Sequence, residues 1–227
     1  MNDNRGSKAI AVIALAIAIV GLGIGFAAFS STLTISSSAT VTPDENVFVN
    51  NIGFDTAGAN SSCTKSDNAV TVDKGTVALK TITGLSAGFT EPGQYVVCTY
   101  NVNNASSYLA YLKNIKFGNG STDVLTCANS TANGAVTPTD SLRDAACATV
   151  TVTAQVGGTA FGTGGSTATL TSAANNSLAI NDGSHTLASQ SGTEKVFVKI
   201  LYAGPAVADG SFTVSIPQIG LTYSTAQ

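Results

Sequence analysis

The chain begins with a short polar head that carries two basic residues, and then continues as an uncharged apolar run over residues 9–29. About twenty helical residues cross the hydrocarbon core of a bilayer, so this run fits either an export signal or a retained membrane anchor. The small residues Gly25, Ala27 and Ala28 at its end favour cleavage, with the bond between Ala27 and Ala28 as the expected site. We therefore predict that residues 1–27 are a signal peptide, and a retained anchor is the alternative.

A period of two begins where the apolar run ends. From residue 29 onward, Ser and Thr fill the even positions up to residue 42, and the apolar side chains fall on odd positions. Such alternation is typical of a strand with one buried face. Residues 28–42 are either the first strand of their own domain or a strand donated to the open sheet of a neighbouring subunit. The side chains expected on the buried face are Phe29, Leu33, Ile35, Ala39 and Val41.

The remainder, residues 43–227, carries repeated strand patterns. Every second side chain is largely apolar in residues 148–156, 195–202 and 211–216. Residues 95–104 are apolar on both faces, which is typical of a strand inside a packed structure. About ten short strands separated by turn signals, with no amphipathic helix after residue 29, predict an all-β domain with a jelly-roll-like β-sandwich fold.

Residue types also predict several local features of this domain. Asp73-Lys74-Gly75 predicts a tight hairpin turn, and Pro217 predicts an edge or a bulge because proline donates no ladder hydrogen bond. Residues 55–68 have the composition of a surface loop. Residues 157–166, GGTAFGTGGS, predict a glycine-rich turn and not a phosphate loop, because neither a GK[ST] sequence nor a helical pattern follows.

Composition narrows the class of partner. Charged residues make up 10% of the chain and its net charge is −3, with no basic patch that would attract nucleic acid. A surface with so few charges is either glycosylated or buried in an assembly, because it would otherwise promote nonspecific association and aggregation. Five Asn-X-Ser/Thr sequons fit glycosylation, and they begin at Asn60, Asn104, Asn119, Asn129 and Asn175.

The four cysteines all follow the export segment. An even number of cysteines in an exported chain favours disulfides, and four cysteines allow three pairings. Their spacing favours the local pairs Cys63–Cys98 and Cys127–Cys147, with four free core thiols as the alternative. Zinc is disfavoured because no CxxC pair is present.

Residues suited to catalysis are few. The single histidine, His185, lies in the turn-like sequence NDGSHT, where a surface position is expected. No HExxH, GxSxG or Walker motif occurs, and the carboxylates are scattered. We therefore expect neither an enzyme nor a bound cofactor or metal.

Three stretches carry a family resemblance. GFAAFSSTLTISSSATV resembles the junction between signal and first strand in exported fibre proteins of the TasA/camelysin type. Pro92-Gly93 followed by YVVCTYNVNNASSYLAYL, and the closing FTVSIPQIGLTYSTAQ, are similar to other strands of that family. Together they cover under half of the chain. Four cysteines and the low charge depart from the better-known members, and one histidine leaves no zinc triad, so the protease activity linked to camelysin is not carried over.

The resemblance implies a secreted subunit that polymerises into an extracellular fibre, in which the N-terminal strand of one copy completes the sheet of the next. The partner would then be the protein itself, with no nucleic acid, and the membrane would be contacted only through the export segment before cleavage. Extracellular or cell-surface location follows. Three other functions stay open: a monomeric surface domain that is anchored or secreted and serves in adhesion, a type IV pilin-like subunit, and a carbohydrate-binding β-sandwich.

Overall fold

The structure is a computed structural model that describes residues 49–118, 124–130, 139–170, 176–180, 183–204 and 211–225. The chain divides into two compact units, Met1–Thr42 and Pro43–Gln227, and every described residue belongs to the second unit. The predicted cleavage site, the strand predicted at 28–42 and the sequons at Asn119 and Asn175 lie outside the described residues.

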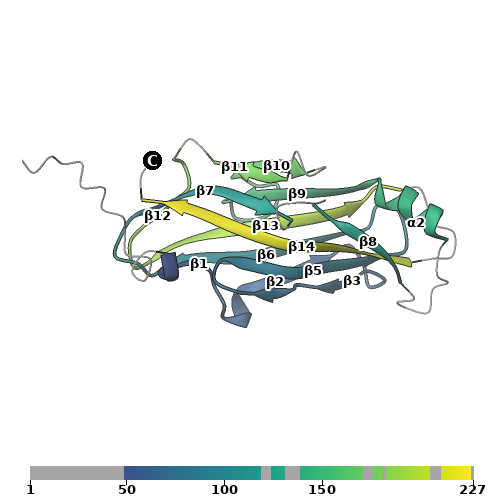
Figure 1. The fold of residues 1–227 in the computed structure, drawn as a ribbon, viewed down its shortest axis with the longest axis horizontal. Helices are drawn as coiled ribbons and strands as arrows, with labels where there is room; N and C mark the ends of the chain where they lie inside the picture. Colours follow the sequence, from purple (N-terminus) through teal and green to yellow (C-terminus); the bar gives the residue numbers. More distant parts are fainter. Residues whose placement is uncertain are drawn as a thin grey trace, which may run out of the picture. The chain divides into compact units, whose positions relative to one another are not determined.

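Two antiparallel sheets make up the second unit (Figure 1). Sheet A contains β1 (Ile52–Phe54), β2 (Ser61–Lys65), β6 (Tyr95–Asn104), β9 (Val150–Val156), β10 (Ser166–Leu170) and β13 (Gly192–Tyr202). Sheet B contains β3 (Thr71–Asp73), β4 (Thr76–Val77), β5 (Thr81–Phe89), β7 (Ala110–Phe117), β8 (Thr126–Ser130), β11 (Ser177–Ala179), β12 (Thr186–Leu187) and β14 (Ser211–Ser224). Two short 3-10 helices, η1 (Val49–Asn51) and η2 (Gly58–Asn60), flank β1, and α2 (Asp140–Cys147) follows β8.

The strand order is that of a jelly roll. Along sheet B, β5, β14, β7 and β11 are neighbours in that order, and along sheet A the order is β6, β13, β9 and β10. Numbered along the chain, these eight strands therefore run 1-8-3-6 in one sheet and 2-7-4-5 in the other, which is the double Greek key of a jelly roll. The predicted all-β, jelly-roll-like sandwich is confirmed.

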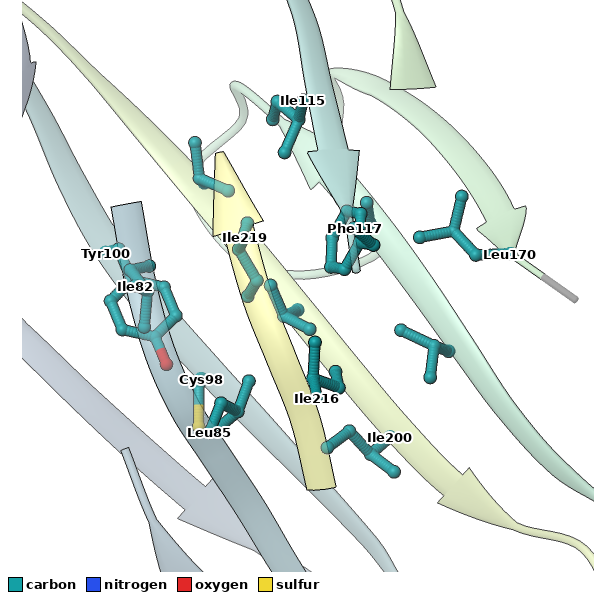
Figure 2. Packing of buried hydrophobic residues seen from close by; sticks show 14 of the residues in the cluster. Ile82, Leu85, Cys98, Tyr100, Ile115, Phe117, Leu170, Ile200, Ile216 and Ile219 are labelled. Atoms are coloured by element: carbon teal, nitrogen blue, oxygen red, sulfur yellow. The ribbon is translucent and has the colours of Figure 1, made fainter. Parts of the chain in front are cut away.

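The core lies between the two sheets because each long strand places alternate side chains inward. Figure 2 shows side chains of both sheets meeting there, with Ile216 of β14 close to Ile200 of β13. At one place the rings of Tyr202 and Phe212 meet edge to face, with their centroids 4.9 Å apart. The even-numbered apolar face predicted for residues 195–202 is thus confirmed, since its four members are all fully buried: Val196, Val198, Ile200 and Tyr202.

Three local predictions are wrong. Residues 73–75 do not form a hairpin turn, because β3 and β4 both pair with β5 and lie one after the other along its edge. The segment 55–68 is not simply a surface loop, since it contains η2 and β2. A helix, α2, follows residue 29 although none was expected; its eight residues are too few for a clear helical period to be seen in the sequence.

Pro217 lies inside β14 and not at a sheet edge. On one side β14 pairs with β5 from Phe212 to Gly220, and the register of this pair passes over Pro217. On the other side its partner changes from β8, which ends its pairing at Ser215, to β7, which begins at Ile219. The proline therefore occupies the gap between two partners, where a missing N–H breaks no ladder.

Both predicted disulfides are confirmed. Cys63 and Cys98 are directly opposite each other on β2 and β6. Cys127 of β8 is joined to Cys147 at the end of α2, which ties this helix to sheet B. The bridges close separations of 35 and 20 residues, and each is expected to stabilise the fold by about 3–4 kcal/mol.

Candidate functional site

The outer face of sheet A, which points away from the core, carries apolar and aromatic side chains beside lysines. On β6 and β13 the odd-numbered residues point outward, because their even-numbered neighbours fill the core. Tyr95, Val97 and Thr99 on β6 lie opposite Leu201, Lys199 and Phe197 on β13 in the register of the two strands. The outward face of this strand pair is therefore partly apolar and aromatic.

The glycine-rich loop between β9 and β10, residues 157–165, is pinned by a buried glutamine. Gln155 is fully buried, and its side-chain Nε2 donates to the carbonyl oxygens of Gly157 and Ala160 at 2.9 and 3.0 Å. Its Oε1 accepts a hydrogen bond from the backbone N–H of Gly162 at 2.7 Å. The predicted glycine-rich turn is confirmed, and one outward-facing side chain of β9 satisfies three of its backbone groups.

Two glycines let this loop fold tightly. A Cβ on Gly158 would lie 2.3 Å from the carbonyl oxygen of Thr163, and a Cβ on Gly165 would lie 2.2 Å from that of Val156. Both residues also have positive φ, 89° and 78°, which favours glycine. Larger residues would push the loop out of its place.

A hollow of about 580 Å³ lies beside this loop on the outer face of sheet A. We call it the outer hollow. β6, β13 and β2 supply one part of its lining, and the loop supplies the other. Its lining residues are Ser62, Thr64, Tyr95, Val97, Thr99, Thr159, Ala160, Phe161, Lys195, Phe197 and Lys199.

Lys199 is held between two rings in the outer hollow. Its Nζ lies 4.9 Å from the ring centroid of Tyr95 and 5.6 Å from that of Phe161. Both distances are in the range of cation–π attraction. Tyr95 is 37% exposed, whereas Phe197 is only 4% exposed although it points outward. The hollow thus combines an accessible ring, an ammonium group oriented by two rings and a buried apolar side chain.

Sequence reasoning missed this site. The apolar character of both faces of residues 95–104 was explained by a central position in the sheet, and β6 does lie between β13 and the β1/β2 pair. The sequence did carry one clue to the site: apolar residues occupy odd-numbered, outward-facing positions on both strands, Tyr95 and Val97 on β6 and Phe197 on β13. Their meeting with Phe161 depends on how the loop folds, which no period shows.

His185 is not on the surface, so that prediction is wrong. It is 7% exposed, and its ring lies between Ser166 Oγ, 2.9 Å from Nε2, and Glu194 Oε1, 3.0 Å from Nδ1. Space for the ring depends on Gly157, because a Cβ there would lie 2.9 Å from both Glu194 Oε1 and His185 Cε1. The histidine is enclosed because it joins β10, β13 and the segment before β12.

Serine, histidine and glutamate occur here in the hydrogen-bonding order of a hydrolase triad. Glu194 and Ser166, however, share the inward-facing register of Val196 and Leu170, and the imidazole is enclosed. The network therefore fits a polar bridge at the margin of the core better than a reactive serine.

The charge of Glu194 also acts on a tyrosine of β14. Burial first, and then the negative charge of Glu194, raise the pKa of Tyr223 well above its usual value.

The described sequons differ in their surroundings. Asn104 is only 1% exposed, and its amide donates to the carbonyl oxygens of Tyr108 and Leu187, so we exclude it as a glycosylation site in the folded chain. Asn129 on β8 donates to Asp140 at 3.0 Å. Asn60 donates to Asp55 at 2.6 Å and remains a predicted site.

The carboxylate of Asp55 accepts several hydrogen bonds at one end of the outer face of sheet A. It accepts from the N–H of Ala57 at 2.9 Å, from Asn103 at 2.7 Å and from Asn60. The backbone bond from Ala57 is the largest influence, and together with the two amides it lowers the pKa of Asp55 below 3.8 even though burial acts in the opposite direction. Asp55 thereby fixes the segment between β1 and β2 to β6.

In the part of the chain that the structure describes, no three His, Cys, Asp or Glu side chains are grouped as metal ligands would be. Within the same residues, no helix has the length and apolar character needed to cross a bilayer.

Comparisons with known proteins give little beyond the fold. No protein-family model matches the chain, and no curated protein matches it. Among solved structures, the chain is similar to TmCBM61 in complex with β-1,4-galactotriose, with 9% identity over 72% of this chain and 88% of that one, and a TM-score of 0.29. It is also similar to the enzymatically active domain of tailspike protein 4 of bacteriophage CBA120, with 9% identity, a TM-score of 0.26 and coverage of 72% of this chain but 20% of that one. Likeness at this level carries no inference about function.

Proposed function

We propose that the protein is an exported, extracellular or surface-displayed subunit that polymerises by donating residues 28–42 to the next subunit. The observation that supports the proposal is that the eight jelly-roll strands of the subunit do not include this segment, which leaves it available to extend an outer strand of another copy. All eight strands of the double Greek key come from residues 81–224, and the compact unit that contains them begins at Pro43. The alternating segment is therefore not needed to complete the strand order of its own subunit.

The outer strands of the two sheets are the kind of element that accepts such a segment. Among the described residues, β10 ends one side of sheet A, and β3 with β4 ends one side of sheet B. An extended segment adds to an outer strand through backbone hydrogen bonds, and alternate side chains enter pockets. A head-to-tail contact of this kind does not close on itself, so it propagates as a filament.

The expected gain is sufficient for a stable contact. Backbone hydrogen bonds contribute about 1 kcal/mol net each. Burial of Leu33, Ile35 and Val41 adds about 1.5–3 kcal/mol for each side chain. Two disulfides, which are typical of proteins from oxidising compartments, support the extracellular or surface location.

The test compares two double variants of the full chain, expressed with its export segment. In one, Leu33→Asp and Ile35→Asp place charges on the face expected to be buried. In the other, Thr32→Asp and Thr34→Asp place the same charges on the opposite face. Negative-stain microscopy and sedimentation of the exported protein measure assembly, and its N-terminal residue is determined by mass spectrometry.

We expect fibres from the unmodified chain and from the variant with charges at 32 and 34, and only single subunits from the variant with charges at 33 and 35. Equal assembly by both variants would show that the strand is not donated in this register. A purified chain that stays monomeric at high concentration, or that retains residues 1–27, would instead support the anchored surface domain.

A further inference from the structure

We propose that the outer hollow of sheet A binds an acidic oligosaccharide, with one sugar carboxylate at Lys199, another at Lys195 and a sugar ring against Tyr95. This binding does not depend on residues 28–42, so it holds whether or not the protein polymerises.

The apolar part of the hollow suits a sugar ring. Tyr95 is 37% exposed on a β-sandwich whose other large aromatic side chains are mostly buried, and it stands beside Val97 and Phe161. Ligand sites typically combine aromatic walls with a few placed polar groups. A ring with an apolar C–H face and polar edges fits such a wall, because tyrosine itself is apolar on its faces and polar at its tip.

The charge of the hollow selects an anion. Two lysines line it, and no aspartate or glutamate is among its lining residues, although acidic residues outnumber basic ones in the whole chain by 13 to 10. Glu194, the neighbour of Lys195, lies in the inward-facing register and is bonded to His185. An acidic ligand would therefore meet two ammonium groups with no adjacent carboxylate on the lining.

The polar groups around the hollow favour a saccharide over an anionic lipid. Ser62 and Thr64 of β2, Thr99 of β6 and Thr159 of the loop contribute four hydroxyl groups to the lining. Hydroxyls can both donate and accept, which matches the alternating hydroxyls of a sugar. Thr64 Oγ1 already donates to the carbonyl oxygen of Val97 at 3.4 Å, but an acyl chain would offer no polar partner to any of the four hydroxyls and would displace water from them, at a cost in free energy.

The hollow is held in shape before any ligand arrives. Gln155 fixes the loop that carries Phe161, and Lys199 is oriented by the rings of Tyr95 and Phe161. Groups that are already ordered lose less conformational entropy on binding. A shallow site can thus reach useful affinity, particularly when a polymer presents many copies of the ligand.

The experiment titrates the full-length exported chain with an oligogalacturonide and with its methyl-esterified counterpart, which has the same sugars without the charge. Binding is followed by calorimetry at low and high salt. Two variants probe the site, Lys199→Gln and Tyr95→Ser. The control is Lys116→Gln, because Lys116 is an exposed lysine that lines a hollow on sheet B without any aromatic side chain.

We expect the acidic oligomer to bind and the ester to bind at least about tenfold more weakly, since a charge-assisted hydrogen bond contributes about 1.5–3 kcal/mol. Lys199→Gln should weaken binding by a similar factor, Tyr95→Ser should weaken binding of the acid, and Lys116→Gln should change it by less than about twofold. High salt should weaken the interaction. No binding of the acid at millimolar concentration, equal binding of the ester, or an equal loss in Lys116→Gln would overturn the proposal.

Discussion

The two faces of the β6–β13 strand pair are both rich in apolar residues, but only the inner face is buried in the core. On the inner face, Tyr100 and Tyr202 are at most 1% exposed and are packed against the opposite sheet. On the outer face, Tyr95 is 37% exposed beside lysines and hydroxyls. The comparison teaches that an apolar side chain on a central strand belongs to the core only when another layer covers it.

The partial cover of the outer face comes from one loop. Residues 157–165 are hydrogen-bonded to the outward-facing, fully buried Gln155, and Phe197 beside the outer hollow is 4% exposed, whereas Tyr95 is 37% exposed. A hollow arises at the boundary between these buried and exposed side chains because the loop stands above the sheet. The core has no such boundary, because sheet B covers it.

The strongest way to test this contrast uses the same residue type on each face. We expect Tyr202→Ala to lower the free energy of unfolding by about 3–5 kcal/mol, because it removes a fully buried ring that packs edge to face on Phe212. Tyr95→Ala should cost less than about 1 kcal/mol, because that ring is already partly in water. Urea denaturation with the disulfides intact measures both, and equal losses would contradict the contrast.

The role of Gln155 in holding the loop of residues 157–165 over the outer face is tested by Gln155→Leu. This change removes three hydrogen bonds to the loop while keeping a side chain of similar size, so we expect a loss of about 1–3 kcal/mol in the free energy of unfolding. Amide hydrogen exchange should rise within residues 157–165. The control is Thr153→Val on the same face of β9, and comparable exchange in both variants would show that Gln155 does not hold the loop.

A smaller effect is expected from the carboxylate at the end of the outer face. Because folding lowers the pKa of Asp55 below 3.8, ionised Asp55 stabilises the folded chain at higher pH, and this contribution is lost as the pH falls through the lowered pKa. Asp55→Asn should therefore be less stable than the wild type by about 1 kcal/mol near neutral pH, since solvent screens hydrogen bonds to this partly exposed carboxylate. The difference should shrink as the pH falls through the lowered pKa of Asp55, because the carboxylate then loses its charge. A difference independent of pH would show that the charge is not responsible.

The smallest stability effect is expected from Lys199→Gln. The lysine is partly exposed and its attraction to two rings is weak in water, so the free energy of unfolding should change by no more than about 0.5–1 kcal/mol. A loss of saccharide binding without a loss of stability would separate the role of the outer hollow from that of the core. A large loss of stability would place Lys199 among the structural residues instead.

Much of the fold follows from local pattern. Alternation in residues 195–202 and 211–216 identified the buried faces of β13 and β14, since a strand turns successive side chains to opposite sides. The short strands were harder, because β1, β3 and β12 have only two or three residues and depend on their neighbours for pairing. Pro217 was predicted at an edge or a bulge, and only the pairing of β14 shows that it occupies the gap between two partner strands.

The candidate site was much less predictable. Tyr95, Phe161 and Lys199 come from three separate segments, and nothing in their spacing brings them together. His185 was expected on the surface because its neighbours favour a turn, but its ring reaches Ser166 and Glu194 across the margin of the core. Asn104 matches a sequon, yet its side-chain amide is buried and donates hydrogen bonds to the carbonyl oxygens of Tyr108 and Leu187.

The sequence by itself determined the class of fold, the two disulfide pairs and the inner faces of the long strands, because these depend on the period of a strand and on local cysteine spacing. Only the tertiary structure decided which apolar side chains stay accessible, which polar ones become buried and where Lys199 meets two aromatic rings. The physical reason is that exposure depends on what packs above each residue, and at the outer hollow that cover is a loop whose path is set by one glutamine and a few glycines.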